Sequence, residues 1–194
     1  MKQFLFLVIL FSTYNITSQI INEHLEVGNQ APEIIGIDQN GLKINSTEIL
    51  KNNKILMVFY RGNWCPHCKK HLKSLQDHLN EFAKKGVYVL VVTPETEGKT
   101  KETQEKLKIT FSIVHDKDNK IMNDYKVAFE VNEENVPNYF DVIIKKIADY
   151  NVKNNNVLPV PATYLIGKDG KIIYVQYDPN YKSRSDFGEI LESL

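Results

Sequence analysis

The chain has 194 residues with 24 basic and 24 acidic side chains, so its formal net charge is zero. A balanced charge gives no electrostatic footprint for nucleic acid, and 42% apolar residues exclude a disordered or collagen-like chain. The chain is long enough to bury a core without disulfide staples, and its two cysteines are too few for a disulfide scaffold.

The first 18 residues have the pattern of a secretory signal peptide. Lys2 precedes an unbroken apolar run over residues 4–11, and small and polar residues follow it up to Ser18. The run is much shorter than the about 20 residues needed to cross a bilayer. We therefore expect cleavage after Ser18 and a soluble mature protein, 19–194, in the periplasm or the extracellular space. A retained N-terminal membrane anchor is the alternative.

Apolar runs and helical stripes alternate along the mature chain. Residues 54–60 and 87–92 are nearly continuous apolar runs, typical of central strands that are covered on both faces. Between them, residues 66–85 predict a helix that stops before Gly86. Further predictions are a strand at 34–37, a polar helix at 99–108, a strand at 111–114, a β-hairpin over 163–175 and a final helix capped by Asp186.

The segment 123–158 is the least regular part of the chain. It contains one helical stripe of apolar side chains between residues 140 and 147, followed by an asparagine-rich loop. Because so short a segment cannot hold a core of its own, we predict an insertion rather than a second domain. The expected fold class is α/β, a single domain with a central mixed β-sheet flanked by helices.

One motif carries the chemistry: Trp64-Cys65-Pro66-His67-Cys68, where a buried strand passes into a helix. Unpaired N–H groups and the positive dipole end at the helix N-terminus favour a thiolate on Cys65. Pro66 suits the first helical turn, and Cys68 lies one turn further on the same face, within bonding reach of Cys65. His67 can place a positive charge or a donor beside the Cys65 sulfur. The motif predicts a redox-active dithiol, which requires Cys65 to be ionised and accessible.

Two other roles for the cysteine pair carry less support. A structural disulfide across so short a loop would stabilise the fold little. Zinc would need four ligands, and Cys65 and Cys68 with His71 or His78 from the same helix lack a second half-site. We therefore expect no metal and no cofactor other than a redox-active disulfide between Cys65 and Cys68.

Together with Val160-Pro161-Ala162-Thr163, the cysteine motif resembles the thioredoxin-like superfamily. The resemblance implies that Pro161 is a cis-proline packed against the disulfide, where it leaves a backbone edge for a substrate chain. Residues 27–32, 59–64 and 164–170 extend the resemblance to the alkyl hydroperoxide reductase/thiol-specific antioxidant branch, the peroxiredoxin-like redoxins. The match covers most of the mature chain and implies a thioredoxin-like fold, with the helical insertion before the cis-proline strand.

The chain departs from the peroxiredoxin pattern at the peroxide site. The Pro, Thr and attacking Cys of that pattern fall on Arg61, Cys65 and Cys68, so only Cys68 matches. Val160-Pro161-Ala162 stands where the peroxiredoxin arginine is expected. The Pro-His pair between the cysteines instead matches the DsbA-like oxidants, which implies a disulfide more oxidising than that of thioredoxin.

Three charged residues near the motif are candidates for supporting roles. Arg61 could stabilise a thiolate or a peroxide oxygen, although a solvated surface arginine is the commoner case. Glu95 and Glu97 follow the second strand, at the edge of the sheet where α/β sites form. One of them could accept a proton from Cys68, although exposed loop acids are commoner.

The leading prediction is an exported thiol-disulfide oxidoreductase that exchanges disulfides through Cys65 and Cys68. Trp64, Pro66 and Val160 are expected to line its substrate groove. A peroxiredoxin-like thiol peroxidase, acting as an antioxidant through the same pair, and a binding module for metals or thiols stay open as alternatives. The expected partners are protein or small-molecule thiols and disulfides, with hydroperoxides under the peroxidase alternative. A membrane redox protein is a further candidate for exchanging electrons, and no nucleic acid is expected.

Overall fold

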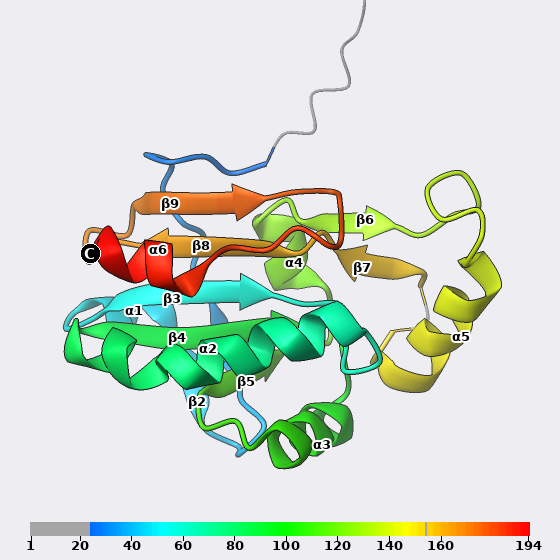
Figure 1. Ribbon diagram of the computed structural model, residues 1–194, viewed down its shortest axis with the longest axis horizontal. Helices are drawn as coiled ribbons and strands as arrows, with labels where there is room; N and C mark the ends of the chain where they lie inside the picture. Colours follow the sequence, from blue (N-terminus) through cyan, green and yellow to red (C-terminus); the bar gives the residue numbers. More distant parts are fainter. Residues whose placement is uncertain (1–23, 154) are drawn as a thin grey trace, which may run out of the picture.

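A five-stranded mixed β-sheet forms the centre of the molecule, with the strand order β5-β4-β3-β8-β9 (Figure 1). The computed structural model describes residues 24–153 and 155–194, so the predicted signal peptide lies outside the described residues. Helices cover both faces of the sheet, and the predicted α/β architecture is confirmed. Within the described part of the chain, every helix is too short or too polar to span a bilayer.

The sheet has a parallel and an antiparallel half. β4 (Val87–Thr93) lies between β3 (Lys54–Phe59) and β5 (Ser112–His115), and both pairings are parallel. β8 (Ala162–Ile166) pairs antiparallel with β3 on its other side and with β9 (Ile172–Tyr177). β3 is therefore the central strand, which explains why its sequence is an almost unbroken apolar run.

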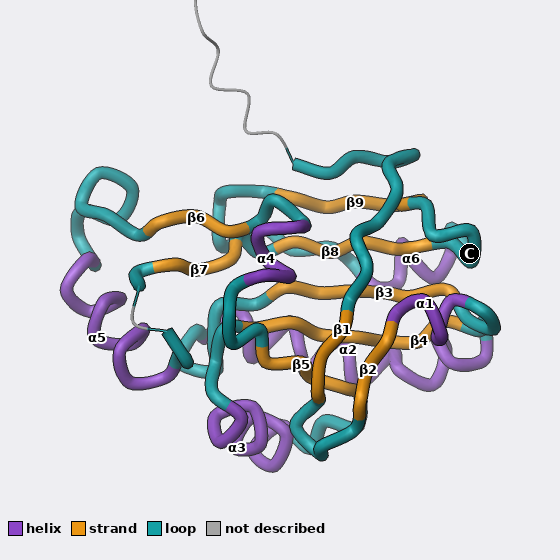
Figure 2. The backbone as a smooth tube through the Cα atoms, turned by 180° about the vertical axis from the view of Figure 1, so that it is seen from behind, coloured by secondary structure: helices purple, strands orange, loops and turns teal. Residues whose placement is uncertain are grey.

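Successive side chains of β3 pack into two separate cores, as the alternation of an extended strand requires. Leu56 packs on the face covered by α2 (Pro66–Lys84) and α6 (Phe187–Glu192), whereas Met57 packs on the opposite face. Figure 2 shows what covers that opposite face: the hairpin of β1 (Ile35–Ile37) and β2 (Lys43–Asn45), α1 (Ser46–Leu50) and α4 (Lys120–Asp124).

The long α2 follows its sequence prediction closely. Of the apolar stripe that the sequence predicts, Leu72, Leu75 and Phe82 are completely buried, and Leu79 is partly buried against the same core. The helix ends at Lys84, and Gly86 then adopts a positive φ of 68°, which a glycine tolerates at a helix C-terminus. The polar α3 (Glu97–Leu107) begins two residues earlier than expected, because the Thr96 side chain caps it by accepting a hydrogen bond from the Lys99 N–H.

The predicted insertion is closed by a two-stranded sheet of β6 (Ala128–Glu130) and β7 (Val157–Pro159). Its helix, α5 (Phe140–Tyr150), lies beyond the end of the central sheet, near the start of α2 (Figure 1). A small apolar cluster forms around Ile147, and Trp64 of the cysteine motif packs against it. The segment 123–158 therefore packs directly on the redox motif.

Several short elements have no counterpart in the sequence predictions: β2, α1, α4, β6 and β7. Each has three to five residues, which is too short for a helical or strand period to stand out from the surrounding residues. Tyr125 and Val127, near the start of the predicted insertion, are completely buried in the core that contains Met57, on the face of the sheet away from α2.

Candidate active site

The cysteine motif lies where β3 passes into α2. Cys65 is the N-cap of α2, with extended backbone, and Pro66 occupies the first helical turn. The free N–H groups of the helix start therefore lie next to Cys65. Both cysteines are reduced and nearly inaccessible, with Cys65 2% and Cys68 1% exposed.

Cys65 is therefore far less exposed than the sequence prediction expected, and the approach to its sulfur is restricted. Cys65 lies in the core cluster against which Trp64 packs, and Arg61 contacts its sulfur. Cys65 nevertheless forms part of the wall of a groove of about 330 Å³, together with Trp64, Pro66 and residues around the start of α5. This groove gives a reactant an approach to Cys65.

Arg61 is the main charged neighbour of Cys65. Its Nη2 donates to the Cys65 sulfur at 3.5 Å, and the side chain is only 6% exposed, so the alternative of a solvated surface arginine is wrong. The guanidinium carbon lies 4.6 Å from the centre of the Tyr181 ring and 5.5 Å from that of Trp64. These two aromatic rings hold the cation in place against the sulfur.

The two cysteines titrate as a coupled pair. The pKa of Cys65 is lowered to about 5, first by the hydrogen bond that the Cys68 thiol donates to it and then, against the cost of burial, by the positive charge of Arg61. The pKa of Cys68 is raised well above its ordinary value by the same hydrogen bond and by burial. At neutral pH the pair therefore holds a Cys65 thiolate beside a Cys68 thiol.

Arg184 is a neighbour of Cys68 that the sequence did not reveal. Its Nη2 lies 3.8 Å from the Cys68 sulfur, and its charge partly opposes the rise in the pKa of Cys68. The residue belongs to the loop before α6, 116 positions from Cys68, so no local spacing could have indicated it. The only signal was its rarity, because Arg61 and Arg184 are the two arginines of the chain.

His67 does not make the predicted contact with the Cys65 sulfur. His67 is exposed, and its ring meets the Tyr181 ring edge-on at 5.6 Å. Among the described residues, side-chain hydrogen bonds reach Cys65 from Arg61 and Cys68 rather than from His67. His71 is buried against Phe187, and burial together with the charge of Arg184 lowers its pKa to about 3.

Among the described residues, the fold brings together no set of ligands that would suit the zinc alternative. Nowhere in residues 24–153 and 155–194 do three or more His, Cys, Asp or Glu side chains come together in a way that could hold a metal ion.

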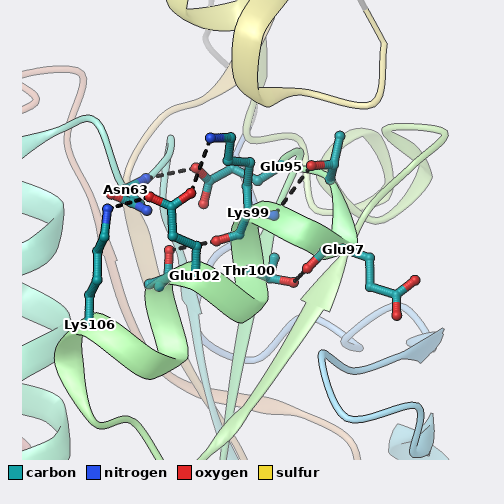
Figure 3. A network of polar contacts seen from close by, with 9 residues as sticks. Asn63, Glu95, Glu97, Lys99, Thr100, Glu102 and Lys106 are labelled. Atoms are coloured by element: carbon teal, nitrogen blue, oxygen red, sulfur yellow. Dashed lines mark hydrogen bonds and ion pairs between the residues drawn. The ribbon is translucent and has the colours of Figure 1, made fainter.

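Glu95 is a fully buried carboxyl group, whereas Glu97 is exposed. Figure 3 shows the Glu95 carboxyl group directed toward Asn63 and that of Glu97 pointing away from it. Glu95 accepts hydrogen bonds from the Tyr60 hydroxyl at 2.7 Å and from the Asn63 backbone N–H at 2.9 Å. Burial raises its pKa to about 6, although these two hydrogen bonds act in the opposite direction. The commoner reading of an exposed loop acid is therefore wrong for Glu95, whose carboxyl group fixes the backbone just before Trp64.

Gly62 allows this close packing. Its φ is 154°, and a Cβ atom there would lie 2.3 Å from Trp64 Nε1 and 3.2 Å from a carboxyl oxygen of Glu95. Any larger residue would collide with the Trp64 ring and with the Glu95 carboxyl group that anchors the loop.

The cis form expected for the Val160–Pro161 bond is wrong, because all peptide bonds in the described residues are trans. The chain runs extended from β7 through this bond into β8, and the trans isomer suits such a path. The Val160 N–H donates to the Val127 carbonyl at 2.8 Å, so this part of the expected free edge is occupied by the protein itself.

Two hollows meet at Arg61 and Tyr181. The one that contains Cys65 also includes Trp64 and Pro66, as predicted for the substrate groove. Val160 and Pro161 line the other hollow, which has a volume of about 550 Å³. The residues predicted for one groove are thus divided between two neighbouring hollows.

The model of the AhpC/TSA family matches residues 27–175. The chain belongs to the AhpC/TSA family. This confirms the branch that the sequence resemblance indicated.

Two relatives have different activities. The thiol-disulfide oxidoreductase ResA of Bacillus cereus is 25% identical over 152 residues, which are 78% of this chain and 69% of that protein. The chloroplastic peroxiredoxin Q of Oryza sativa subsp. japonica is 22% identical over 177 residues, which are 91% of this chain and 70% of that protein. Both relatives are thiol-based oxidoreductases, and a thiol-based redox function is supported for this family member.

Solved structures share the fold. Peroxiredoxin 6 of Arenicola marina superposes with a TM-score of 0.69 at 17% identity, covering 87% of this chain and 71% of that one. Peroxidoxin BcpB of Mycobacterium tuberculosis gives a TM-score of 0.64 at 16% identity, covering 79% and 86%. These similarities confirm the thioredoxin-like fold.

Proposed function

We propose that the protein is a thiol-disulfide oxidoreductase that uses Cys65 and Cys68 as its redox pair. The observation that carries the proposal is the Cys65 sulfur, with a pKa lowered to about 5, held between Arg61 and the thiol of Cys68. A sulfur that is ionised at neutral pH is a nucleophile, and a thiol one helical turn away can close the bond with it.

The reaction proceeds in two exchanges. The Cys65 thiolate attacks one sulfur of a substrate disulfide, which forms a mixed disulfide and releases the other substrate sulfur as a thiolate that takes up a proton. Cys68 then loses its proton and attacks the Cys65 sulfur. This forms the Cys65–Cys68 disulfide, releases the second substrate thiol and transfers two electrons to the substrate. The reverse sequence oxidises a dithiol.

Each neighbouring residue has a role in this scheme. Arg61 stabilises the Cys65 thiolate, both as nucleophile and as leaving group. Arg184 favours the Cys68 thiolate at the moment of the second exchange. Trp64 and Pro66 line the approach to the sulfur, whereas Pro161 and Val160 shape the neighbouring hollow, and His67 contributes to the groove wall.

Trapping tests this function. In a Cys68→Ala variant the second exchange cannot occur, so mixed disulfides on Cys65 should accumulate and identify the substrates by mass spectrometry. The wild type should reduce insulin or oxidise a reduced dithiol peptide with multiple turnovers. Absence of both trapped species and turnover would contradict the proposal.

A thiol peroxidase is the second candidate, favoured by the guanidinium of Arg184 beside Cys68. There a cysteine thiolate attacks a hydroperoxide, the O–O bond breaks, and sulfenic acid and an alcohol or water form. The second cysteine then condenses with the sulfenic acid to the same disulfide and releases water. Stopped-flow oxidation by hydrogen peroxide separates the two candidates, because an oxidoreductase without peroxidase activity reacts no faster than a free thiol of the same pKa.

We also propose that the protein is exported, on the basis of the apolar run and small residues of its first 18 positions. Protein or small-molecule thiols and disulfides outside the cytosol would then be its partners, and a membrane redox protein would be one route for electrons. N-terminal sequencing of the secreted protein should find Gln19 as the first residue.

A further inference from the structure

The groove in front of Cys65 has an apolar wall that the segment 123–158 provides. Val136, Tyr139 and Val142 line it opposite the cysteine motif. Tyr139 is 62% and Val142 58% exposed, which places them among the most exposed large apolar side chains in the described part of the chain. We call this hollow, lined by Cys65, Trp64, Val136, Tyr139 and Val142, the α5 groove.

The α5 groove offers little to a charged ligand. Among its described lining residues, Arg61 is the only one with a permanent charge, and its guanidinium faces the Cys65 sulfur between two aromatic rings. The carboxylates of a free amino-acid thiol would find only this one guanidinium, which is already engaged with the sulfur, and its ammonium group would find no counter-charge among the described lining residues. Aliphatic or aromatic side chains would instead bury apolar surface against Tyr139 and Val142.

The backbone edge before Pro161 cannot provide the whole recognition. The Val160 N–H already donates to the Val127 carbonyl at 2.8 Å, so this donor is not free for an incoming strand. Side-chain contacts in the α5 groove, which contains Cys65, are a second means of holding a substrate next to the sulfur.

We propose that the α5 groove selects polypeptide substrates whose cysteine is flanked by aliphatic or aromatic residues. The occupant must carry a thiol or disulfide because the groove contains Cys65, and it must be apolar next to that sulfur because of the lining. This inference rests on the proposed oxidoreductase function and specifies its substrate class.

Two synthetic peptide disulfides test the inference with the reduced full-length protein. One peptide has leucine and phenylalanine beside its cysteine, the other has aspartate at both positions, and glutathione disulfide serves as the small reference. We expect the wild type to react at least about tenfold faster with the apolar peptide than with the acidic one. Tenfold corresponds to about 1.4 kcal/mol of contact energy.

Variants of the groove lining test whether these side chains cause the preference for the apolar peptide. In Val142→Asp, the ratio of the rate with the apolar peptide to the rate with glutathione disulfide should fall about tenfold, and Tyr139→Ser should lower it in the same direction. Ile35→Asp is the control, because Ile35 is 67% exposed on β1, on the face of the sheet away from α2. Its ratio should stay at the wild-type value, and equal melting temperatures would show that all variants are folded.

Three results would overturn the inference. The wild type could react equally with both peptides, or Val142→Asp could keep the wild-type ratio. A concentration-dependent dimer in sedimentation, lost in Val142→Asp, would assign the α5 groove to a second copy of the chain. Failure to react with either peptide or with glutathione disulfide is a separate outcome, which would refute the oxidoreductase function itself.

Discussion

Cys65 and Cys68 are three positions apart, both nearly inaccessible and each beside one of the two arginines, yet their pKa values move in opposite directions. Burial alone would raise both. The difference arises because the Cys68 thiol donates its hydrogen bond to Cys65, whose sulfur also has the closer guanidinium and the helix start. Which cysteine of a buried pair is ionised thus depends on the direction of the hydrogen bond between them and on where the positive charges lie.

Removing each sulfur in turn gives the largest expected effect. Cys65→Ser should lower disulfide turnover by about a thousandfold or more, because the nucleophile is lost. Cys68→Ser should keep the first exchange and stop at the mixed disulfide. Insulin reduction and non-reducing mass spectrometry measure the two outcomes. If Cys68→Ser lost the first exchange and Cys65→Ser kept it, the assigned roles would be reversed.

Neutralising Arg61 should weaken the asymmetry between the sulfurs. In Arg61→Gln we expect the pKa of Cys65 to rise from about 5 by about one to two units, because an opposite charge in contact with the thiolate is removed. At pH 6 the rate of iodoacetamide alkylation should fall up to about tenfold. Arg184→Gln is the matched control and should leave the midpoint of the alkylation profile nearly unchanged. An unchanged midpoint in Arg61→Gln would show that the arginine is structural.

The same charge affects the redox potential. A stabilised Cys65 thiolate favours the reduced state, so the wild-type potential should lie above the about −270 mV of thioredoxin. Arg61→Gln should lower it by about 30 mV for each unit by which the pKa of Cys65 rises. Equilibration with glutathione buffers measures both potentials, and a wild-type value near that of thioredoxin would contradict this expectation.

The ionisation of Glu95 should make the stability of the fold depend on pH. Its pKa of about 6 in the folded protein lies above the ordinary value of 4.5, so the ionised carboxyl group destabilises the fold. The free energy of unfolding should therefore be greatest below about pH 4.5 and fall by about 2 kcal/mol through pH 6, relative to Glu95→Gln. Urea unfolding of both oxidised proteins at several pH values measures the difference. Parallel pH profiles would mean that Glu95 is ionised without cost.

Arg184 should have the smallest effect, because it is more distant and partly exposed. In Arg184→Gln we expect the closing of the mixed disulfide by Cys68 to slow by a few-fold. The pKa of His71 should rise from about 3, because the charge of Arg184 helps to lower it. Rapid quenching follows the first effect and NMR titration the second. A slower closing step with an unmoved His71 would indicate a change of loop position rather than of charge.

The sequence predicts the fold well where a pattern is long. β3, β4 and α2 each extend over six or more residues with a clear period or apolar run, and their predicted and observed positions agree within a residue or two. β6 and β7 have three residues each, and only their pairing across the segment 123–158 makes them strands. Such pairing depends on tertiary contacts and leaves no period in the sequence.

The site was predictable only as far as local spacing carries information. Cys65 and Cys68 are recognisable because helix geometry relates positions three apart. Arg184 approaches Cys68 from the C-terminal loop, and Glu95 is buried with hydrogen bonds from Tyr60 and the Asn63 backbone, so both depend on the finished fold. The cis form assigned to Pro161 failed for the same reason, since the path from β7 into β8 decides the isomer.

Trp64 is the only tryptophan of the chain, and it packs both against the core around α2 and against the cluster around Ile147. Its indole also lies against the guanidinium of Arg61, next to the reactive sulfur. Its fluorescence is therefore a built-in reporter that needs no label. Oxidation of the pair, occupation of the groove and detachment of the α5 segment would each alter the emission of this single ring, so all three could be followed in real time with the unmodified protein.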